Sequence, residues 1–482
     1  MNLPLVLRVA AILMLIVSGF MLTPVIVALA YGEYWTIPGF LIPVAVTLLF
    51  ASGYLMATRR EYGLLSNRGG FLLVSLSWIL ASVVGAFPFL LTGAVGSYVD
   101  AFFETMSGFT TTGASILTEI EGLPRSVLFW RSLTHWLGGM GIIVLTVAIF
   151  PLLGIGGLQL IKAEAPGPTV DKITPKITET AKILWLTYII FTVAQVLLLL
   201  LGGMDLFDAL THTFGTLATG GFSPKNSSVG HYDSAYIDGV ITVFMIMAGI
   251  NFALYFKLIT RRFVSIRRDT ELKAYLAFFL LSTVLVTLSL HGEVYAGVGK
   301  SVRYAAFQTA SMLTTTGYAT ADFAAWPAVA QVVLFLLMFI GGCAGSTGGG
   351  IKVIRIVTLF KQGLNEMKFL LHPRAVFRIR LSGEPVGKHI VYAISGFVFL
   401  YMFLLLFTTG VVAAAGNDIL TSLTTALATL GNIGPGFGAV GPTFNYSFFP
   451  DGLKLYLSVV MMLGRLEVYT VLILFTPGFW KN

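Results

Sequence analysis

The sequence predicts an all-α integral membrane protein in which four parallel repeats form a pseudo-fourfold ring beside two further N-terminal transmembrane helices. Each repeat consists of a span, a pore helix and a second span. The 482 residues are 56% hydrophobic and 11% charged, with a mean hydropathy of +0.87, whereas soluble proteins carry about 25% charged residues. Apolar stretches recur along the whole chain, and a short phrase of threonine and glycine recurs between them.

Ten stretches qualify as spans, because a span requires about 20 mostly apolar residues. The first is too long for a cleavable signal peptide and has no clear cleavage site. The last eight form four pairs, and each pair encloses a semi-polar stretch that is too long for a tight helical hairpin. The ten spans are 3–31, 36–57, 71–93, 126–154, 183–203, 236–259, 274–290, 327–360, 390–415 and 453–477.

The charges predict the orientation of these spans. Lysine and arginine gather in the linkers between pairs, so the linkers and both termini are expected in the cytoplasm and the semi-polar stretches outside. The net charge of +8 is therefore a signal of topology; nucleic-acid binding is a poor alternative, since the charges are spread over several short loops. The extra helices occupy residues 1–60, and the repeats occupy 61–160, 161–265, 266–370 and 371–482.

The four semi-polar stretches align without gaps, and one glycine of each coincides. The first ten residues of each read as a short helix that ends before this glycine. The second and fourth copies are degenerate, so the predicted ring is asymmetric. The stretches are DAFFETMSGFTTTGAS (100–115), DALTHTFGTLATGGFS (208–223), YAAFQTASMLTTTGYA (304–319) and TSLTTALATLGNIGPG (421–436).

The repeated phrase predicts an ion filter. Extended backbone at mid-membrane depth is tolerated only where it lines water or is buried in protein. A glycine allows the turn that points carbonyls at an axis, and rings of carbonyl oxygens replace the hydration shell of potassium. Small-residue helix packing is the alternative, but four copies in register favour a filter. The predicted filter residues are Thr111, Thr112, Gly113, Thr219, Gly220, Gly221, Thr315, Thr316, Gly317, Asn432, Ile433 and Gly434.

Residues 341–350 read GGCAGSTGGG, inside the second span of the third repeat. Each glycine costs a helix about 1 kcal/mol relative to alanine, so this run favours an unwound intramembrane loop that obstructs the ion path and moves to open it. Close packing of glycines at a helix crossing is the alternative. The predicted gate residues are Gly341, Gly342, Gly345, Ser346, Thr347, Gly348, Gly349 and Gly350, together with Arg465.

Arg465 lies in the last span, where an ionised arginine costs at least about 2.5–3.5 kcal/mol. We expect it to face the pore, repel cations and bond carbonyls of the loop. A pair with Glu467 is disfavoured because residues two apart do not share a helix face; a pair with another acid remains open. His135 and its following glycines are expected to pack a helix crossing, and the role of His212 stays open.

Acidic residues in the semi-polar stretches have two interpretations. Asp100, Glu104 and Asp208 either concentrate cations at the pore mouth or cap helix N-termini. The single cysteine, Cys343, excludes an internal disulfide framework and cysteine-rich metal sites. Because no phosphate-binding loop, dinucleotide fingerprint or HExxH motif is present, a response to nucleotide requires a partner.

These motifs resemble those of the TrkH family, the membrane subunits of bacterial Trk-type potassium uptake systems within the Trk/Ktr/HKT superfamily. TTTGAS, ATGGFS, TTTGYA and GNIGPG fit the four filter segments of that family in order, and the resemblance covers the whole chain. It implies a potassium-channel-like pore, potassium as the ion at the filter, and gate roles for the glycine-rich loop and Arg465. Sodium-preferring relatives can carry serine at the first filter glycine, which is Gly113 here.

The resemblance also implies a homodimer in the bacterial inner membrane and a cytoplasmic, TrkA-like regulatory ring that binds NAD and ATP. No cofactor is expected on this chain. A potassium symporter coupled to protons or sodium is the alternative, although such folds commonly have inverted repeats and acidic residues in the spans; here the chief acid is Glu467. An enzyme is not expected, because no catalytic His/Asp or Ser/Lys arrangement stands out within the spans.

Overall fold

The computed structural model describes residues 2–58, 65–139, 177–375 and 377–481. Part of the predicted span 126–154, the basic linker that follows it and the boundaries between the first three predicted domains lie outside these residues. Six helical segments are long and apolar enough to cross a membrane. The predicted fold class is confirmed by this helical architecture and by the structural comparison described below.

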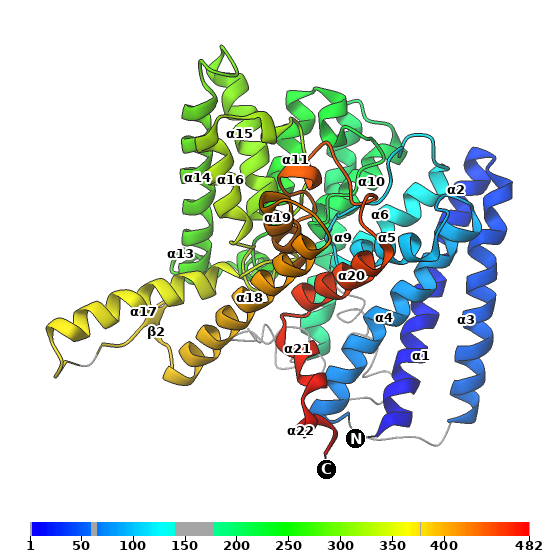
Figure 1. Cartoon of the computed structure of the whole chain (residues 1–482), viewed down its shortest axis with the longest axis horizontal. Helices are drawn as coiled ribbons and strands as arrows, with labels where there is room; N and C mark the ends of the chain where they lie inside the picture. Colours follow the sequence, from blue (N-terminus) through cyan, green and yellow to red (C-terminus); the bar gives the residue numbers. More distant parts are fainter. Residues whose placement is uncertain (1, 59–64, 140–176, 376, 482) are drawn as a thin grey trace.

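Two N-terminal helical segments stand beside the rest of the molecule (Figure 1). The first comprises α1 (Leu3–Phe20) and α2 (Thr23–Tyr31), and the second comprises η1 (Tyr34–Thr36) and α3 (Ile37–Ala57). Helix α1 packs against α3 and against the first helix of the first repeat. The buried face of α1 is a stripe of aliphatic residues spaced three or four apart, as an amphipathic helix requires.

The remaining chain forms four repeats, each with a short helix of 12–16 residues between two further helices. The short helix packs against the first span of its own repeat, and second spans pack against the short helix of the next repeat: α6 on α10, α11 on α15, and α20 back on α5. The last contact joins the fourth repeat to the first. The repeats are α4 (Asn67–Leu91), α5 (Tyr98–Phe109) and α6 (Arg125–Gly139); α9 (Ile177–Leu201), α10 (Leu206–Ala218) and α11 (Ala235–Ala248); α14 (Thr270–Leu290), α15 (Val298–Leu313) and α16 (Ala328–Met338); and α18 (Lys388–Ala414), α19 (Ile419–Leu430) and α20 (Asp451–Arg465).

Three of the predicted second spans are not continuous helices. The span 236–259 bends by 93° between α11 and α12 (Phe252–Ile259), and the span 453–477 bends by 114° after α20. In the span 327–360, α16 ends at Met338 and helix resumes only with α17 (Val353–Leu371). The break in the third repeat was predicted from its glycine-rich stretch. The bends in the spans 236–259 and 453–477 were not predicted, because hydropathy reports depth in the bilayer and not direction.

Short elements connect these segments. Helix α17 projects away from the bundle and leads through a small hairpin into α18 (Figure 1). The chain ends in short turns after the bend that follows α20. These elements are η3 (Ser228–Tyr232), α13 (Phe263–Arg267), η4 (Phe323–Ala325), β1 (Arg380–Leu381), β2 (Glu384–Pro385), η5 (Gly438–Val440), α21 (Tyr469–Leu472), η6 (Ile473–Phe475) and α22 (Pro477–Trp480).

Side-chain caps start three of the four short helices. Ser97, Asp205 and Asp418 each accept a hydrogen bond from a backbone N–H in the first turn, which satisfies one of the free donors at a helix N-terminus. Hydrogen bonds from the side chain and backbone of Thr421 lower the pKa of the Asp418 carboxyl. Helix α15 follows Gly297 and has no side-chain cap.

Candidate functional site

All four short helices end in the same way, just before the predicted filter glycines. One residue adopts a left-handed backbone, and the N–H of the following residue donates to the carbonyl five residues earlier, at 2.8–2.9 Å. This arrangement is a Schellman cap, which usually has glycine at the left-handed position. Here that position holds Thr111 (φ 53°), Thr219 (φ 55°), Thr315 (φ 60°) and Asn432 (φ 53°).

The predicted filter glycines are left-handed as well, two residues after each cap. Their φ values are 79° at Gly113, Gly221 and Gly317, and 96° at Gly434. The residue between each cap and its glycine has no positive φ. The backbone therefore alternates in hand along each filter segment, in the degenerate second and fourth repeats as in the other two.

The four segments meet in a closed ring of backbone contacts. A Cβ atom added at Gly113 would overlap the carbonyl oxygen of Gly220, and one at Gly221 would overlap that of Thr316. In the same order, a Cβ at Gly317 would overlap the carbonyl oxygen of Ile433, and one at Gly434 would come within 2.7 Å of that of Thr112. Each glycine thus faces the carbonyl of the next repeat, and only glycine fits this approach.

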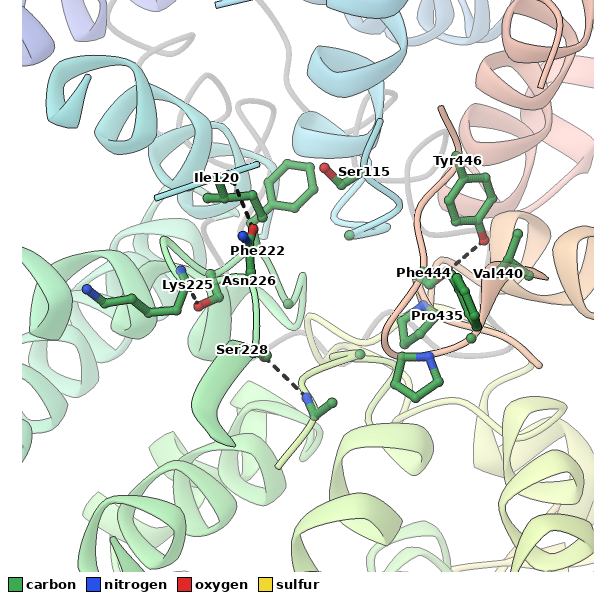
Figure 2. Close-up of a pocket in the computed structure, with 18 of the residues that line it drawn as sticks. Ser115, Ile120, Phe222, Lys225, Asn226, Ser228, Pro435, Val440, Phe444 and Tyr446 are labelled. Carbon is green, nitrogen blue, oxygen red and sulfur yellow. Dashed lines mark hydrogen bonds between the residues drawn. The ribbon is translucent and has the colours of Figure 1, made fainter. Parts of the chain in front are cut away.

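A cavity of about 90 Å³ lies on the side of the ring toward which the chain leaves the filter, and all four filter glycines line it. Figure 2 shows this cavity, with Ser115 and Phe222 on one side and Pro435 and Tyr446 on the other. The hydroxyl of Tyr446 donates to the carbonyl of Gly434 at 2.7 Å. Loops that follow the filter segments therefore build the wall of this cavity.

The predicted gate loop lies on the opposite side of the ring, against the ends of the short helices. It folds back on itself: Gly341 donates to the carbonyl of Ile351 at 2.9 Å. The N–H of Gly349 donates to Oγ1 of Thr315 at 2.7 Å, and a Cβ at Gly349 would overlap the carbonyl oxygen of Gly431. The loop is not helical, as its glycines predicted, and it contacts the third and fourth filter segments directly.

Glu271 holds both ends of this loop. One oxygen of its buried carboxylate accepts from the N–H of Ala344 at 2.8 Å and from that of Ile354 at 3.0 Å. Within the loop, Nζ of Lys352 donates to the carbonyl of Gly348. Glu271 and Lys352 were not predicted as gate residues. Glu271 lies about 80 residues from the loop in the sequence, and no local pattern connects the two.

Arg465 ends α20 and contacts backbone carbonyls of two other repeats. Its guanidinium donates to the carbonyls of Thr347 at 2.7 Å, Gly138 at 2.7 Å and Gly139 at 2.9 Å. Glu467 forms an ion pair with Arg355. The arginine therefore fastens the gate loop to the wall of the first repeat.

The acidic residues at the pore mouth are engaged in pairs. Glu104 is fully buried and forms an ion pair with Arg131 at 2.6 Å, so it does not lie at an open mouth, and the expectation that it concentrates cations there is corrected. Asp100 pairs with Lys454. Asp208 accepts from Tyr232 and lies 3.5 Å from Lys225. The cap of α10 is Asp205 instead.

The two histidines that lie behind the filter are buried. Nδ1 of His135 lies 2.7 Å from the carbonyl of Gly108, and its ring stacks on Phe222 at 4.1 Å. A Cβ at Gly138 would overlap a backbone oxygen of α5, which fits the helix-crossing role expected for this segment. His212 contacts Ser223, as described below. Among the described residues, no group of three or more His, Cys, Asp or Glu is placed to hold a metal ion.

Parallel re-entrant repeats around a ring of backbone carbonyls define a class of helical membrane transport proteins. The comparisons with known proteins place the chain within this class. The family model described as "TrkH: Cation transport protein" matches residues 37–481. The chain belongs to the TrkH family, and the family predicted from the four filter motifs is confirmed. It is therefore a multi-pass membrane transport protein and not an enzyme.

Relatives and a solved structure match along the full length. The Trk system potassium uptake protein TrkH of Escherichia coli K12 is 43% identical, over 98% of this chain and 99% of the relative. The TrkH protein of Halomonas elongata is 40% identical over 100% of both chains. The crystal structure of the potassium transporter TrkH from Vibrio parahaemolyticus matches with a TM-score of 0.89 and 38% identity, over 100% of both chains.

Proposed function

We propose that this protein takes up potassium across the bacterial inner membrane through a filter built from four pore loops. The observation that carries the proposal is the closed ring of backbone contacts. In it, each filter glycine faces a carbonyl of the next repeat, the one that belongs to the residue just before that repeat's own filter glycine. The relatives named potassium uptake proteins support potassium as the ion. Potassium is the cargo, and the chain's own oxygen atoms are its ligands.

The carbonyl oxygens of Thr112, Gly220, Thr316 and Ile433 replace the hydration shell of the ion, one from each repeat. Threonine hydroxyls in the same segments offer further oxygens. The C-terminal ends of the four short helices point partial negative charge toward a cation on the gate side of the ring. Glycine at position 113 favours potassium over sodium, by resemblance to the family.

The glycine-rich loop and Arg465 form the gate below this filter. The loop lies against the ends of the short helices, and Arg465 holds it through the carbonyl of Thr347. A fixed positive charge at this depth repels cations and is costly to leave unpaired. Release of the Arg465 contacts frees the loop to move out of the ion path.

The topology and partners follow from charge and family. Both termini and the basic linkers lie in the cytoplasm, and the repeats divide at the boundaries predicted from the sequence. The membrane subunit acts as a homodimer in the lipid bilayer. A cytoplasmic, TrkA-like nucleotide-binding subunit docks on the basic linkers and regulates the gate. The name "Trk system" of the relatives supports a system of more than one component.

Flux through purified protein in liposomes tests the proposal. With a potassium gradient and no other driving ion, we expect potassium flux that exceeds sodium flux under matched gradients. Saturable uptake that disappears without a proton or sodium gradient would instead establish the symporter mechanism. Equal flux of both ions through folded protein would contradict the assigned filter.

A further inference from the structure

In three of the four repeats, the same position on the short helix braces the filter strand that leaves the ring. Nine residues before the filter glycine, the sequence carries a different polar residue in each repeat: Glu104, His212, Gln308 and Thr425. All four side chains are buried. A buried polar group requires a partner, and three of these find theirs on the strand just beyond the filter glycine of their own repeat.

In the first repeat the brace is a carboxylate. Glu104 accepts from the hydroxyl of Ser115 at 2.9 Å and from the N–H of Ile116 at 2.9 Å. These residues follow Gly113 by two and three positions. The strand that leaves the filter is thus bound to the helix that enters it, which fixes the position of the intervening glycine.

The third repeat repeats this geometry with an amide. The side-chain amide of Gln308 is assigned the orientation in which both of its polar atoms meet a suitable partner. Its nitrogen then donates to the carbonyl of Tyr318 at 3.3 Å, and its oxygen accepts from the N–H of Thr320 at 2.9 Å. Thr320 follows Gly317 by three positions, as Ile116 follows Gly113. The same backbone N–H is therefore held in both repeats.

The second and fourth repeats reach the strand by other contacts. The position equivalent to Ile116 is Pro224, which has no N–H to donate, and His212 contacts the hydroxyl of Ser223 at 3.1 Å instead. In the fourth repeat, Oγ1 of Thr424 accepts from the N–H of Phe437 at 3.1 Å. Thr425 itself makes no hydrogen bond through Oγ1 within the described part of the chain.

The brace of the first repeat differs from the others in two ways. It is a charged carboxylate, and its partner Arg131 also contacts the second repeat. Nε of Arg131 donates to Glu104 at 2.6 Å, and the same guanidinium donates to the carbonyl of Ser223 at 2.9 Å. The guanidinium also lies 3.6 Å from the ring of Phe222. The side chains of Glu104 and Arg131 are 0% and 2% exposed. Water therefore cannot solvate either charge if its partner is removed.

We propose that the buried Glu104–Arg131 pair determines cation selectivity by positioning the filter strands of the first two repeats. The inference rests on the proposed filter. Discrimination between potassium and sodium depends on the number and placement of coordinating oxygens. The pair holds the strands that follow Gly113 and Gly221, and the carbonyl of Gly220 lies against Gly113. Glu104 and Arg131 are positioning residues and do not touch the ion.

The test compares permeability ratios of purified variants in liposomes. Glu104→Gln removes the charge and keeps an acceptor oxygen, whereas Arg131→Met removes both donors. We expect each to lower the potassium-to-sodium permeability ratio several-fold. The matched control is Asp238→Asn, because the buried Asp238 forms an ion pair at 2.7 Å with the partly exposed Arg303, and this pair does not contact a filter strand. The control is expected to keep the wild-type ratio.

A double variant separates positioning from simple stability. Removal of both members of a buried ion pair is often neutral for stability, whereas removal of one leaves an uncompensated charge. Glu104→Leu combined with Arg131→Met is therefore expected to recover the melting temperature and retain the lowered ratio. Recovery of both quantities would overturn the proposal, because the pair would then be structural only.

Two further variants, Ser115→Ala and Gly113→Ser, test the brace and the filter separately. If the single charge variants do not give monodisperse protein, Ser115→Ala removes one contact of Glu104 and the bond from the N–H of Leu117 while the ion pair stays in place, and an unchanged ratio in Ser115→Ala overturns the proposal. Gly113→Ser tests the filter itself. If Gly113→Ser lowers the potassium-to-sodium permeability ratio and the Glu104 and Arg131 variants do not, the proposed role of the pair is rejected. If Gly113→Ser leaves the ratio unchanged, the proposed filter itself is rejected.

Discussion

The backbone N–H of Gly349 donates a hydrogen bond to Oγ1 of Thr315 over 2.7 Å, so the glycine-rich loop is bonded to the left-handed cap of the third filter segment. The hydroxyl of Thr315 accepts this bond from the loop, while its left-handed backbone turns the chain into the filter. A β-branched residue is unfavourable in the left-handed region. The hydrogen bond gives a physical reason for threonine, rather than glycine, at this cap.

Replacement of Thr315 by valine is predicted to raise basal potassium flux. Valine keeps the shape but removes the acceptor, and an unsatisfied buried N–H costs about 1–3 kcal/mol. Each 1.4 kcal/mol shifts the balance between closed and open loop about tenfold. Thr111→Val is the matched control, because Thr111 holds the same cap with φ 53° and its Oγ1 has no partner within the described residues. Equal flux in both variants would contradict the bond's role in gating.

Replacement of Glu271 is predicted to loosen both ends of the gate loop. Glu271→Ala removes the acceptor for Ala344 and Ile354, and hydrogen bonds to a charged group contribute about 1.5–3 kcal/mol each. We expect higher basal flux and faster hydrogen exchange at residues 344–354. Glu271→Gln retains an acceptor oxygen and is expected to lie close to the wild type. If Gln raises flux as much as Ala does, the charge and not the tether is what matters.

The sequence was sufficient for the repeated parts of this molecule. Gly113, Gly221, Gly317 and Gly434 stand in one column of a gapless alignment, and the structure gives all four the same backbone. The braces at Glu104, His212 and Gln308 were missed although these residues, with Thr425, form another column of that alignment. Their residue types differ, so similarity alone does not reveal them; the available signal was a polar residue at a fixed distance before the filter glycine in all four repeats.

Contacts between distant segments could not be predicted in this way. The sequence leaves Glu104 either as an acid at the pore mouth or as a helix cap, because hydropathy does not say which face of a short helix is buried. Its partner Arg131 lies 27 residues later, on another helix. The bends after α11 and α20 were also missed, since an apolar stretch of sufficient length satisfies the rule for a span whatever its direction.

Replacement of Arg465 is predicted to open the gate. Arg465→Ala removes hydrogen bonds to the carbonyls of Thr347, Gly138 and Gly139, together with the positive charge that repels cations. We expect basal flux to rise by about tenfold or more, if the closed loop loses at least the 1.4 kcal/mol that corresponds to that factor. Partial deletion of 341–350 is expected to act in the same direction.

The matched comparison for Arg465 is the conservative change to lysine. Lysine keeps the charge, but its compact ammonium does not reproduce the planar fork that reaches three carbonyls. Flux between the wild-type and alanine values is therefore expected in Arg465→Lys. Lys388→Ala, which removes an exposed basic charge at the start of α18, controls for net charge. Unaltered or lower flux in folded Arg465→Ala would remove this residue from the gate.

Replacement of Gly317 by serine is predicted to weaken discrimination between potassium and sodium and to lower stability. The added Cβ would overlap the carbonyl oxygen of Ile433, so that one oxygen of the ring must move. The left-handed φ of 79° costs a non-glycine residue about 1–2 kcal/mol more. Permeability ratios from paired gradients measure the first effect, and thermal unfolding in detergent measures the second.

The control for Gly317 is Gly239→Ser in α11, where an added Cβ meets no atom within 4 Å. This change adds the same hydroxymethyl group without touching a filter carbonyl, so we expect the wild-type permeability ratio. Gly113→Ser should act like Gly317→Ser, because its Cβ overlaps the carbonyl oxygen of Gly220 in the same way. Unchanged ratios in both filter variants would show that these carbonyls do not coordinate the ion, whatever the fold of the ring.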